Sequence, residues 1–102
     1  MQNVKSVSLE DKKIFCILLQ NYGLYKPETL YKLPCPFHND VNPSLQINVD
    51  KAFFFCYGCG AKGTSYDLIH YAEPNLNSFQ ILKKIQEIRM QIRGEEGEGG
   101  YR

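Results

Sequence analysis

The stretch Cys35–Cys59, CPFHNDVNPSLQINVDKAFFFCYGC, contains two pairs of metal-binding side chains. Cys35 and His38 form the first pair and Cys56 and Cys59 the second, each with two residues between its members. The segment between the pairs is inside the range of roughly 15 to 20 residues at which such pairs converge on one metal ion. Three thiolates and one imidazole complete a tetrahedral set. The stretch therefore predicts one structural Zn²⁺, with no open position for a catalytic water.

The segment between the ligand pairs predicts two short strands joined by a turn. Over Leu45–Val49 apolar residues alternate with polar ones, which is the pattern of a half-buried strand. Ala52–Cys56 is aromatic, and alternation along a strand sends Phe54 and Cys56 to one face. The other face receives Phe53, Phe55 and Tyr57. Ligand pairs on hairpin turns are typical of a zinc ribbon.

Helices are expected on both sides of this ribbon. The first covers about 8–21, opened by Ser8 as a cap, and the last covers about 78–93. A shorter helix, capped by Thr64 or Ser65, ends before Pro74. The expected fold is α+β: a small antiparallel sheet stabilised by zinc, with flanking helices. We divide the chain into a domain over 1–93, whose ribbon core is 33–69, and a disordered tail or linker over 94–102.

The last helix has an apolar stripe, which we expect to cover the sheet or to lie against the first helix. The stripe consists of Ile81, Leu82, Ile85, Ile88 and Ile92. Docking of this stripe onto another protein is the second interpretation.

Disulfide bonds, a redox pair and an iron site are three alternative roles for the cysteines, and each fits the sequence less well. Two disulfides leave His38 unexplained, and the chain shows no signal peptide, so we expect a cytoplasmic protein with reduced thiols. A thioredoxin-like Cys56–Cys59 pair would need a βαβ setting. Iron prefers four thiolates, so the histidine favours zinc without excluding iron. Cys16 is interpreted as a small buried apolar residue and His70 as a surface residue.

A resemblance to a known family rests on the runs 35–40 (CPFHND), 42–44 (NPS) and 55–60 (FCYGCG), followed by Gly63 and Asp67. Together they resemble the N-terminal zinc-binding domain of bacterial, DnaG-type DNA primases. The resemblance is dense from about 33 to 69. It implies a module that engages a single-stranded DNA template and helps to select where a primer starts.

The charge of the chain does not by itself indicate a strong DNA binder. The net charge is only +1, and residues 35–75 contain two lysines against four acidic residues. Aromatic rings are the alternative means of holding unpaired bases. We expect contacts from Tyr57 and Lys62, beside the metal, and from Lys51 and Phe55. A core position for Phe53 and Phe55 is at least as well supported.

The sequence contains no catalytic constellation: no paired aspartates for magnesium and no phosphate-binding loop. The resemblance implies that polymerisation belongs to a separate domain, so the partners expected are template DNA and a catalytic primase domain or replicative helicase. The chain is then a part of a longer primase or a short protein of a phage or mobile element. The competing hypothesis is a regulatory zinc ribbon that binds a replication or transcription protein and no DNA.

Overall fold

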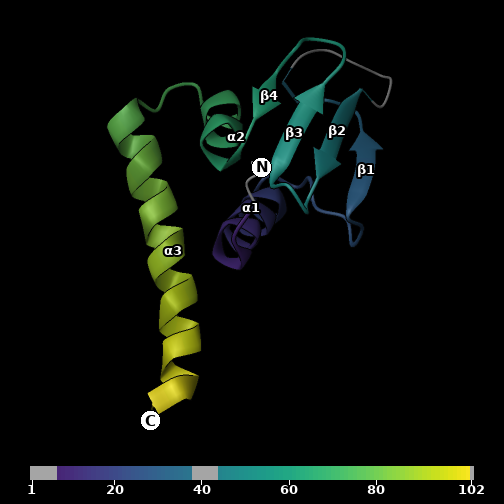
Figure 1. The fold of residues 1–102 in the computed structure, drawn as a ribbon. Helices are drawn as coiled ribbons and strands as arrows, with labels where there is room; N and C mark the ends of the chain where they lie inside the picture. The colour runs from purple at the N-terminus through teal and green to yellow at the C-terminus, as the bar shows by residue number, and fades with distance from the viewer. Residues whose placement is uncertain (1–6, 38–43, 102) are drawn as a thin grey trace, which may run out of the picture.

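The computed structural model describes residues 7–37 and 44–101, and for 95–101 it gives only the course of the helix. In these residues the chain forms three helices and four strands (Figure 1). In chain order they are α1 Leu9–Asn21, β1 Leu30–Leu33, β2 Leu45–Asn48, β3 Phe53–Cys56, β4 Lys62–Gly63, α2 Ser65–Ala72 and α3 Ser78–Tyr101. The predicted α+β fold is confirmed.

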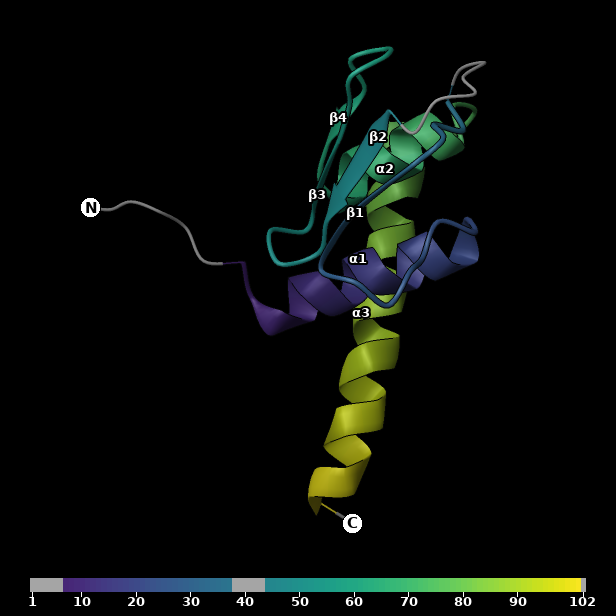
Figure 2. The ribbon, with the colours of Figure 1, turned by 90° about the vertical axis from the view of Figure 1, so that its right-hand side faces the viewer.

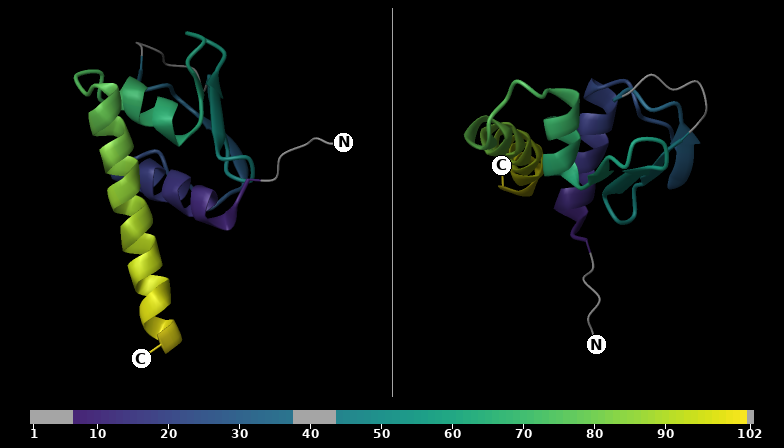
Figure 3. Two further views of the ribbon diagram at one scale, coloured as in Figure 1. Left: turned by 60° about the vertical axis from the view of Figure 1, so that its left-hand side comes forward. Right: turned by 90° about the horizontal axis from the view of Figure 1, so that it is seen from above.

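The four strands form one antiparallel sheet in the order β1-β2-β3-β4. The helices gather on one side of this sheet, and the views in Figures 2 and 3 leave its other side uncovered. α1 and α2 pack against each other, and α3 packs across both of them. The domain therefore has a helical layer, which we use as the name for α1, α2 and α3, and a sheet with one solvent-facing side.

Alternation along β2 and β3 separates core side chains from exposed ones. Leu45, Ile47, Phe54 and Cys56 are fully buried on the side of the helices. Phe53 lies on the other side and is 37% exposed. The predicted division of the strand is thus confirmed. Of the two positions left open for Phe53 and Phe55, the core and the opposite face, both rings lie on the opposite face, and Phe55 is half-buried there.

The first helix begins as the sequence predicts. The Oγ of Ser8 accepts a hydrogen bond from the backbone N–H of Asp11 at 3.1 Å, which satisfies one of the free donors of the first turn. The core side of α1 is fully buried and consists of Ile14, Phe15, Leu18 and Leu19. Cys16, expected to be buried, is only half-buried, because it lies at the edge of that stripe.

The last helix buries most of its predicted stripe, but not all of it. Ile81, Ile88 and Ile92 are buried, whereas Leu82 is 56% exposed. One residue along a helix is a turn of about 100°, so Leu82 is rotated away from Ile81 and out of the contact with α1 and α2. The stripe thus lies against the first helix, which was one of the two expected positions.

The same helix also continues to Tyr101, beyond the end expected near Arg93. The expected disordered tail is therefore helical over most of 94–102. That segment contains no proline, which would end a helix, although four of its residues are glycines, which are poor helix formers. Its assignment as a linker stays a prediction.

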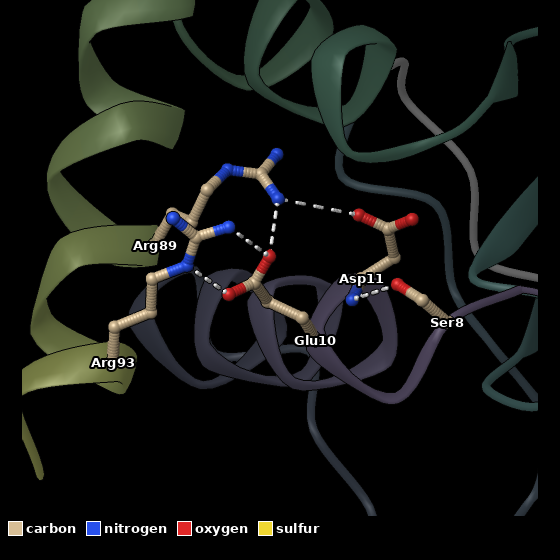
Figure 4. A network of polar contacts seen from close by, with 5 residues as sticks. All are labelled: Ser8, Glu10, Asp11, Arg89 and Arg93. Atoms are coloured by element: carbon tan, nitrogen blue, oxygen red, sulfur yellow. Dashed lines mark hydrogen bonds and ion pairs between the residues drawn. The ribbon is translucent and has the colours of Figure 1, made fainter. Parts of the chain in front are cut away.

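Charged contacts also join α1 to α3 (Figure 4). Glu10 accepts hydrogen bonds from Arg89 at 2.6 Å and from the Nε of Arg93 at 2.8 Å. These bonds and the paired guanidinium charges lower the pKa of the Glu10 carboxyl below its ordinary value. The contacts add a directional polar link to the apolar packing between α1 and α3, because a carboxylate between two guanidinium groups is directional.

Candidate metal centre and the adjacent sheet face

Three cysteines meet at the end of the sheet where β3 finishes. Cys35 follows β1, Cys56 ends β3, and Cys59 lies in the turn after it. Their Sγ atoms all lie within 4.8 Å of one another, and those of Cys35 and Cys59 are 3.9 Å apart. Three sulfurs at such separations can share one ion. We call this part of the molecule, Cys35 with the turn from Cys56 to Cys59, the knuckle end.

The fourth predicted ligand lies outside the described residues. His38 belongs to the segment 38–43, on which the structure gives no information. The grouping of the three cysteines is therefore observed, and the complete ligand set stays a prediction.

Backbone amides surround the sulfurs as they do in metal-binding turns. The N–H of Phe37 donates to the Sγ of Cys35 at 3.4 Å, and the N–H of Gly58 donates to the Sγ of Cys56 at 3.3 Å. Each donor lies two residues after its cysteine, so the two turns repeat one geometry. Donors directed at sulfur stabilise thiolates, which are the form that binds metal.

The electrostatics of the cluster call for a cation. Burial raises the pKa of the Cys35 thiol to about 12. Burial also acts to raise the pKa of Cys56, but backbone N–H groups of Cys59 and Gly58 outweigh it, so that pKa is lowered. Adjacent thiolates in a buried site repel one another unless a metal neutralises them. Soft sulfur ligands select zinc among the common divalent ions, so the donor set fits a structural Zn²⁺.

Aromatic packing supports the knuckle end from the core side. The ring of Phe37, between the first two predicted ligands, lies 6.0 Å from Phe54 and 5.5 Å from Tyr71 of α2, measured between centroids. Phe54 and Tyr71 meet edge to face. His70 is exposed on α2, as expected of a surface residue. Asp67 caps α2 by accepting the N–H of Thr64 at 3.1 Å.

The uncovered side of the sheet, which we call the outer face, carries rings and lysines. Tyr57 is 63% exposed and meets half-buried Phe55 edge to face, with centroids 4.7 Å apart. The register of the sheet places Lys62 opposite Phe55, and Phe55 opposite Gln46. Three of the four residues expected to contact DNA, Phe55, Tyr57 and Lys62, thus lie close together beside the knuckle end.

The fourth of these residues lies elsewhere. Lys51 is in the turn before β3, at the other end of that strand from Tyr57. There it lines a cavity of about 340 Å³ together with Asp11 and Arg89 of the helical layer. The structure therefore does not bring Lys51 to the cluster of Phe55 and Tyr57.

Lys32 is a member of the outer face that was not predicted from the sequence. Its Nζ lies 5.5 Å from the centroid of the Tyr57 ring, a cation–π distance, and its Cα partner in β2 is Gln46. The alternation of apolar and polar residues in β1 could have indicated it, because Lys32 stands between Tyr31 and Leu33, which point to the core. The pairing of β1 with β2, which brings Lys32 to Tyr57, was not predictable from spacing.

Comparisons with known proteins agree with this geometry. Residues 2–98 match the family described as CHC2 zinc finger, Zn_ribbon_DnaG. The chain is 33% identical over 73 residues to a DNA primase from Salmonella typhimurium, covering 68% of this chain and 12% of that protein. It is 45% identical over 61 residues to one from Buchnera aphidicola subsp. Acyrthosiphon pisum, covering 59% and 10%. A Pseudomonas putida DNA primase is 32% identical over 68 residues, covering 66% and 10%.

The chain thus spans about a tenth of the length of these curated relatives. The match confirms the resemblance drawn from the cysteine motif. Together with the three neighbouring thiols, it identifies the knuckle end as a structural zinc site. None of the helices in the described part of the chain combines the length and the apolar character needed to cross a membrane.

Proposed function

The chain belongs to the CHC2 zinc finger family, and on that premise we propose that it is the template-binding module of a DNA primase. In this proposal the zinc-folded domain holds single-stranded DNA and helps a separate catalytic domain to select the site where a primer starts. The proposal is supported by the relatives, which are DNA primases about ten times longer than the matched region. It is also supported by the composition of the outer face.

The outer face is the observation that carries the proposal. In the sheet register, Lys32, Gln46, Phe55 and Lys62 form one row across all four strands. Tyr57 stands next to this row, with the Lys32 ammonium over its ring. Exposed rings stack unpaired bases of any sequence, and flanking lysines attract the phosphates. A single-stranded DNA can thus lie over this row, perpendicular to the strands.

The modest charge of the domain predicts weak binding. A face with two lysines neutralises few phosphates, so the affinity should fall only slightly with added salt compared with a strongly basic protein. Stacking, at about 1 to 3 kcal/mol per base, then supplies much of the free energy. Weak binding suits a module whose template is also held by a catalytic domain, since two linked weak sites act together.

The experiment is a titration of the zinc-loaded protein with short fluorescent single-stranded DNA at low and physiological salt. Tyr57→Ala and Lys62→Ala should each weaken binding several-fold while the zinc content stays stoichiometric. The matched controls lie on α3: Phe79→Ala removes a ring that is 73% exposed, and Lys83→Ala removes an exposed lysine. Equal losses from the controls, or no binding of any DNA at low salt, would refute the proposal.

The proposed ligand set is Cys35, His38, Cys56 and Cys59 around one Zn²⁺. The three thiols already lie at suitable separations, and His38 supplies the imidazole that completes four ligands. His38→Ala should release the metal and unfold the sheet. A His38→Ala protein that retains one zinc per chain would reject this set. Reduced thiols are needed to hold the ion, so we place the protein in the cytoplasm.

The partner in this proposal is a catalytic primase domain. The zinc-binding domain by itself is inactive in nucleotide polymerisation. A direct assay is priming by a catalytic domain that lacks its own zinc module, with this chain added in trans. Start-site selection should appear with the zinc-loaded chain and be absent with Tyr57→Ala. A replicative helicase is the other protein partner, testable by co-sedimentation.

A protein-interaction module is the second candidate, and α3 is the observation that favours it. The side of α3 turned away from α1 and α2 exposes Phe79, Leu82 and Met90, which are 73%, 56% and 61% accessible. Such a stripe is typical of helices that dock into an apolar groove. In this case Phe79→Ala and Met90→Ala would abolish partner binding, whereas Tyr57→Ala and Lys62→Ala would change nothing.

A further inference from the structure

The side of α3 turned away from the other helices carries a symmetrical series of residues, which we call the distal stripe. It consists of Phe79, Leu82, Gln86, Met90 and Arg93, all of them exposed. The intervals between successive members are three, four, four and three residues, which keeps them on one side of the helix. These intervals are the same in both directions along the chain, with Gln86 at the centre. The distal stripe can therefore pack, member on member, against an antiparallel copy of itself.

An antiparallel pair with its two-fold axis at Gln86 gives each member of the distal stripe a suitable partner. Leu82 lies opposite Met90 of the second copy, so both side chains bury apolar surface. Phe79 lies opposite Arg93, whose side chain is 66% exposed beside Glu10 and can cover the ring. Gln86 lies opposite the Gln86 of the second copy, and an amide can donate to and accept from an identical amide. No apolar side chain faces an incompatible group in this register.

The charges beside the distal stripe complement themselves in the same register. Lys83 and Glu87 are exposed on one flank of it, and neither has an ion-pair partner among the residues whose side chains are described. In an antiparallel pair with a two-fold axis, each flank of one helix lies beside the same flank of the other. The register brings Lys83 within two residues of Glu87 in the second copy, about 3 Å along the helix axis. The ion pair can thus form twice across one interface.

We propose that the distal stripe is a homodimer interface, in which two copies of the chain pack antiparallel about a two-fold axis at Gln86. Such an interface is closed, so association stops at the dimer. Each copy contributes three apolar side chains, so the interface is small and the dissociation constant should lie between roughly 10 µM and 1 mM. Figures 1 and 3 show α1 and α2 between α3 and the sheet, so the dimer leaves both outer faces free.

The experiment is sedimentation equilibrium of the zinc-loaded chain, without DNA, from about 5 µM to about 1 mM. The unchanged protein should pass from monomer to dimer with no larger species. Leu82→Ala should raise the dissociation constant at least about tenfold, because a symmetric interface contains each substitution twice. The matched control is Leu9→Ala on α1, which removes a leucine that is 66% exposed outside the distal stripe and should leave the dissociation constant unchanged.

Charge reversal and a central substitution test the register. Lys83→Glu alone places two acidic side chains opposite each other, and Glu87→Lys alone places two basic ones, so each should weaken the dimer several-fold. The double variant should regain the affinity of the unchanged protein. Gln86→Leu replaces the polar centre by an apolar contact and should tighten the dimer about tenfold, since a polar residue at a helix–helix seam costs stability. Zinc content and circular dichroism verify that each variant is folded.

Each outcome supports or overturns a part of this inference. A monomer at every concentration overturns it and leaves the distal stripe to a protein of another sequence. A dimer that Leu82→Ala does not weaken overturns the assignment to α3. A double charge variant as weak as the two single variants overturns the antiparallel register. Because these measurements contain no DNA, they do not depend on whether the outer face binds a template.

Discussion

At the knuckle end, three thiols lie within 4.8 Å of one another, whereas the helical layer is joined by aliphatic side chains and by arginines on a carboxylate. In the first region we expect one Zn²⁺ to supply most of the stabilisation of the folded state. In the second, stabilisation is spread over many buried groups, such as Leu18 and Ile88. Loss of a metal ligand at the knuckle end should therefore unfold the sheet almost completely. A substitution in the helical layer should lower the free energy of unfolding only by a few kcal/mol.

Removal of the metal tests this contrast with the largest expected effect. Chelation should abolish the cooperative unfolding of the sheet, because structural zinc contributes on the order of 10 kcal/mol in small finger peptides. Thermal unfolding with and without chelator, together with zinc analysis, measures it. Cys56→Ser should behave like the chelated protein, and Cys16→Ser, outside the cluster, should keep its zinc. An unchanged transition without metal would contradict the contrast.

A cavity in the helical layer should have the next largest effect. Leu18 is fully buried, so Leu18→Ala should lower the free energy of unfolding by about 2 to 5 kcal/mol. The control is Leu82→Ala, which changes a leucine that is 56% exposed and should stay within about 0.5 kcal/mol. Urea denaturation at saturating zinc gives both values. A loss of zinc from folded Leu18→Ala would mean that the two regions are not independent.

The joint between the two regions is Gly63, the last residue of β4 before α2 begins at Ser65. Its φ is +143°, and a Cβ there would collide with the Asp67 carboxylate that caps α2. Gly63→Ala should therefore lower the free energy of unfolding by about 1 to 3 kcal/mol. Gly94→Ala on α3 meets nothing within 4 Å and should have the opposite sign, a gain of up to about 1 kcal/mol. Equal shifts in urea midpoint would contradict this role of Gly63.

The contact between Glu10 and the arginines should give the smallest effect, visible through its dependence on pH. The hydrogen bonds from Arg93 and Arg89 hold the pKa of Glu10 below its ordinary value of 4.5. A lowered pKa in the folded state means stabilisation above about pH 4.5 that is lost as the pH falls through the folded-state value. Glu10→Gln should be less stable than the unchanged protein at pH 7 and converge with it in acid.

The measurement is the difference between the urea midpoints of the two proteins at several pH values. Acid also displaces zinc from thiolates, but it does so in both proteins, so the difference isolates Glu10. A difference that does not depend on pH would show that the contact acts through packing and not through charge.

Local features of this fold were readable from the sequence where one segment contained all the information. The Ser8 cap, the alternation in β2 and β3 and the cysteine spacing each depend on residues close together in the chain, and each appears as predicted. The sequence was less informative about which apolar side chains are covered. It left two positions open for Phe53 and placed Leu82 in the apolar stripe of the last helix, and both side chains are exposed in the structure.

The sequence by itself determined the family, the zinc-binding cysteines and the α+β class, because metal ligands and strand periodicity are short-range patterns. Only the tertiary structure decided which residues meet across the chain. It placed Lys32 over Tyr57, Tyr57 against Gln46, and Arg89 and Arg93 on Glu10. These contacts follow from strand pairing and from the crossing of α3 over α1. Such long-range packing is set by burial of the whole core and leaves no periodic trace in any one segment.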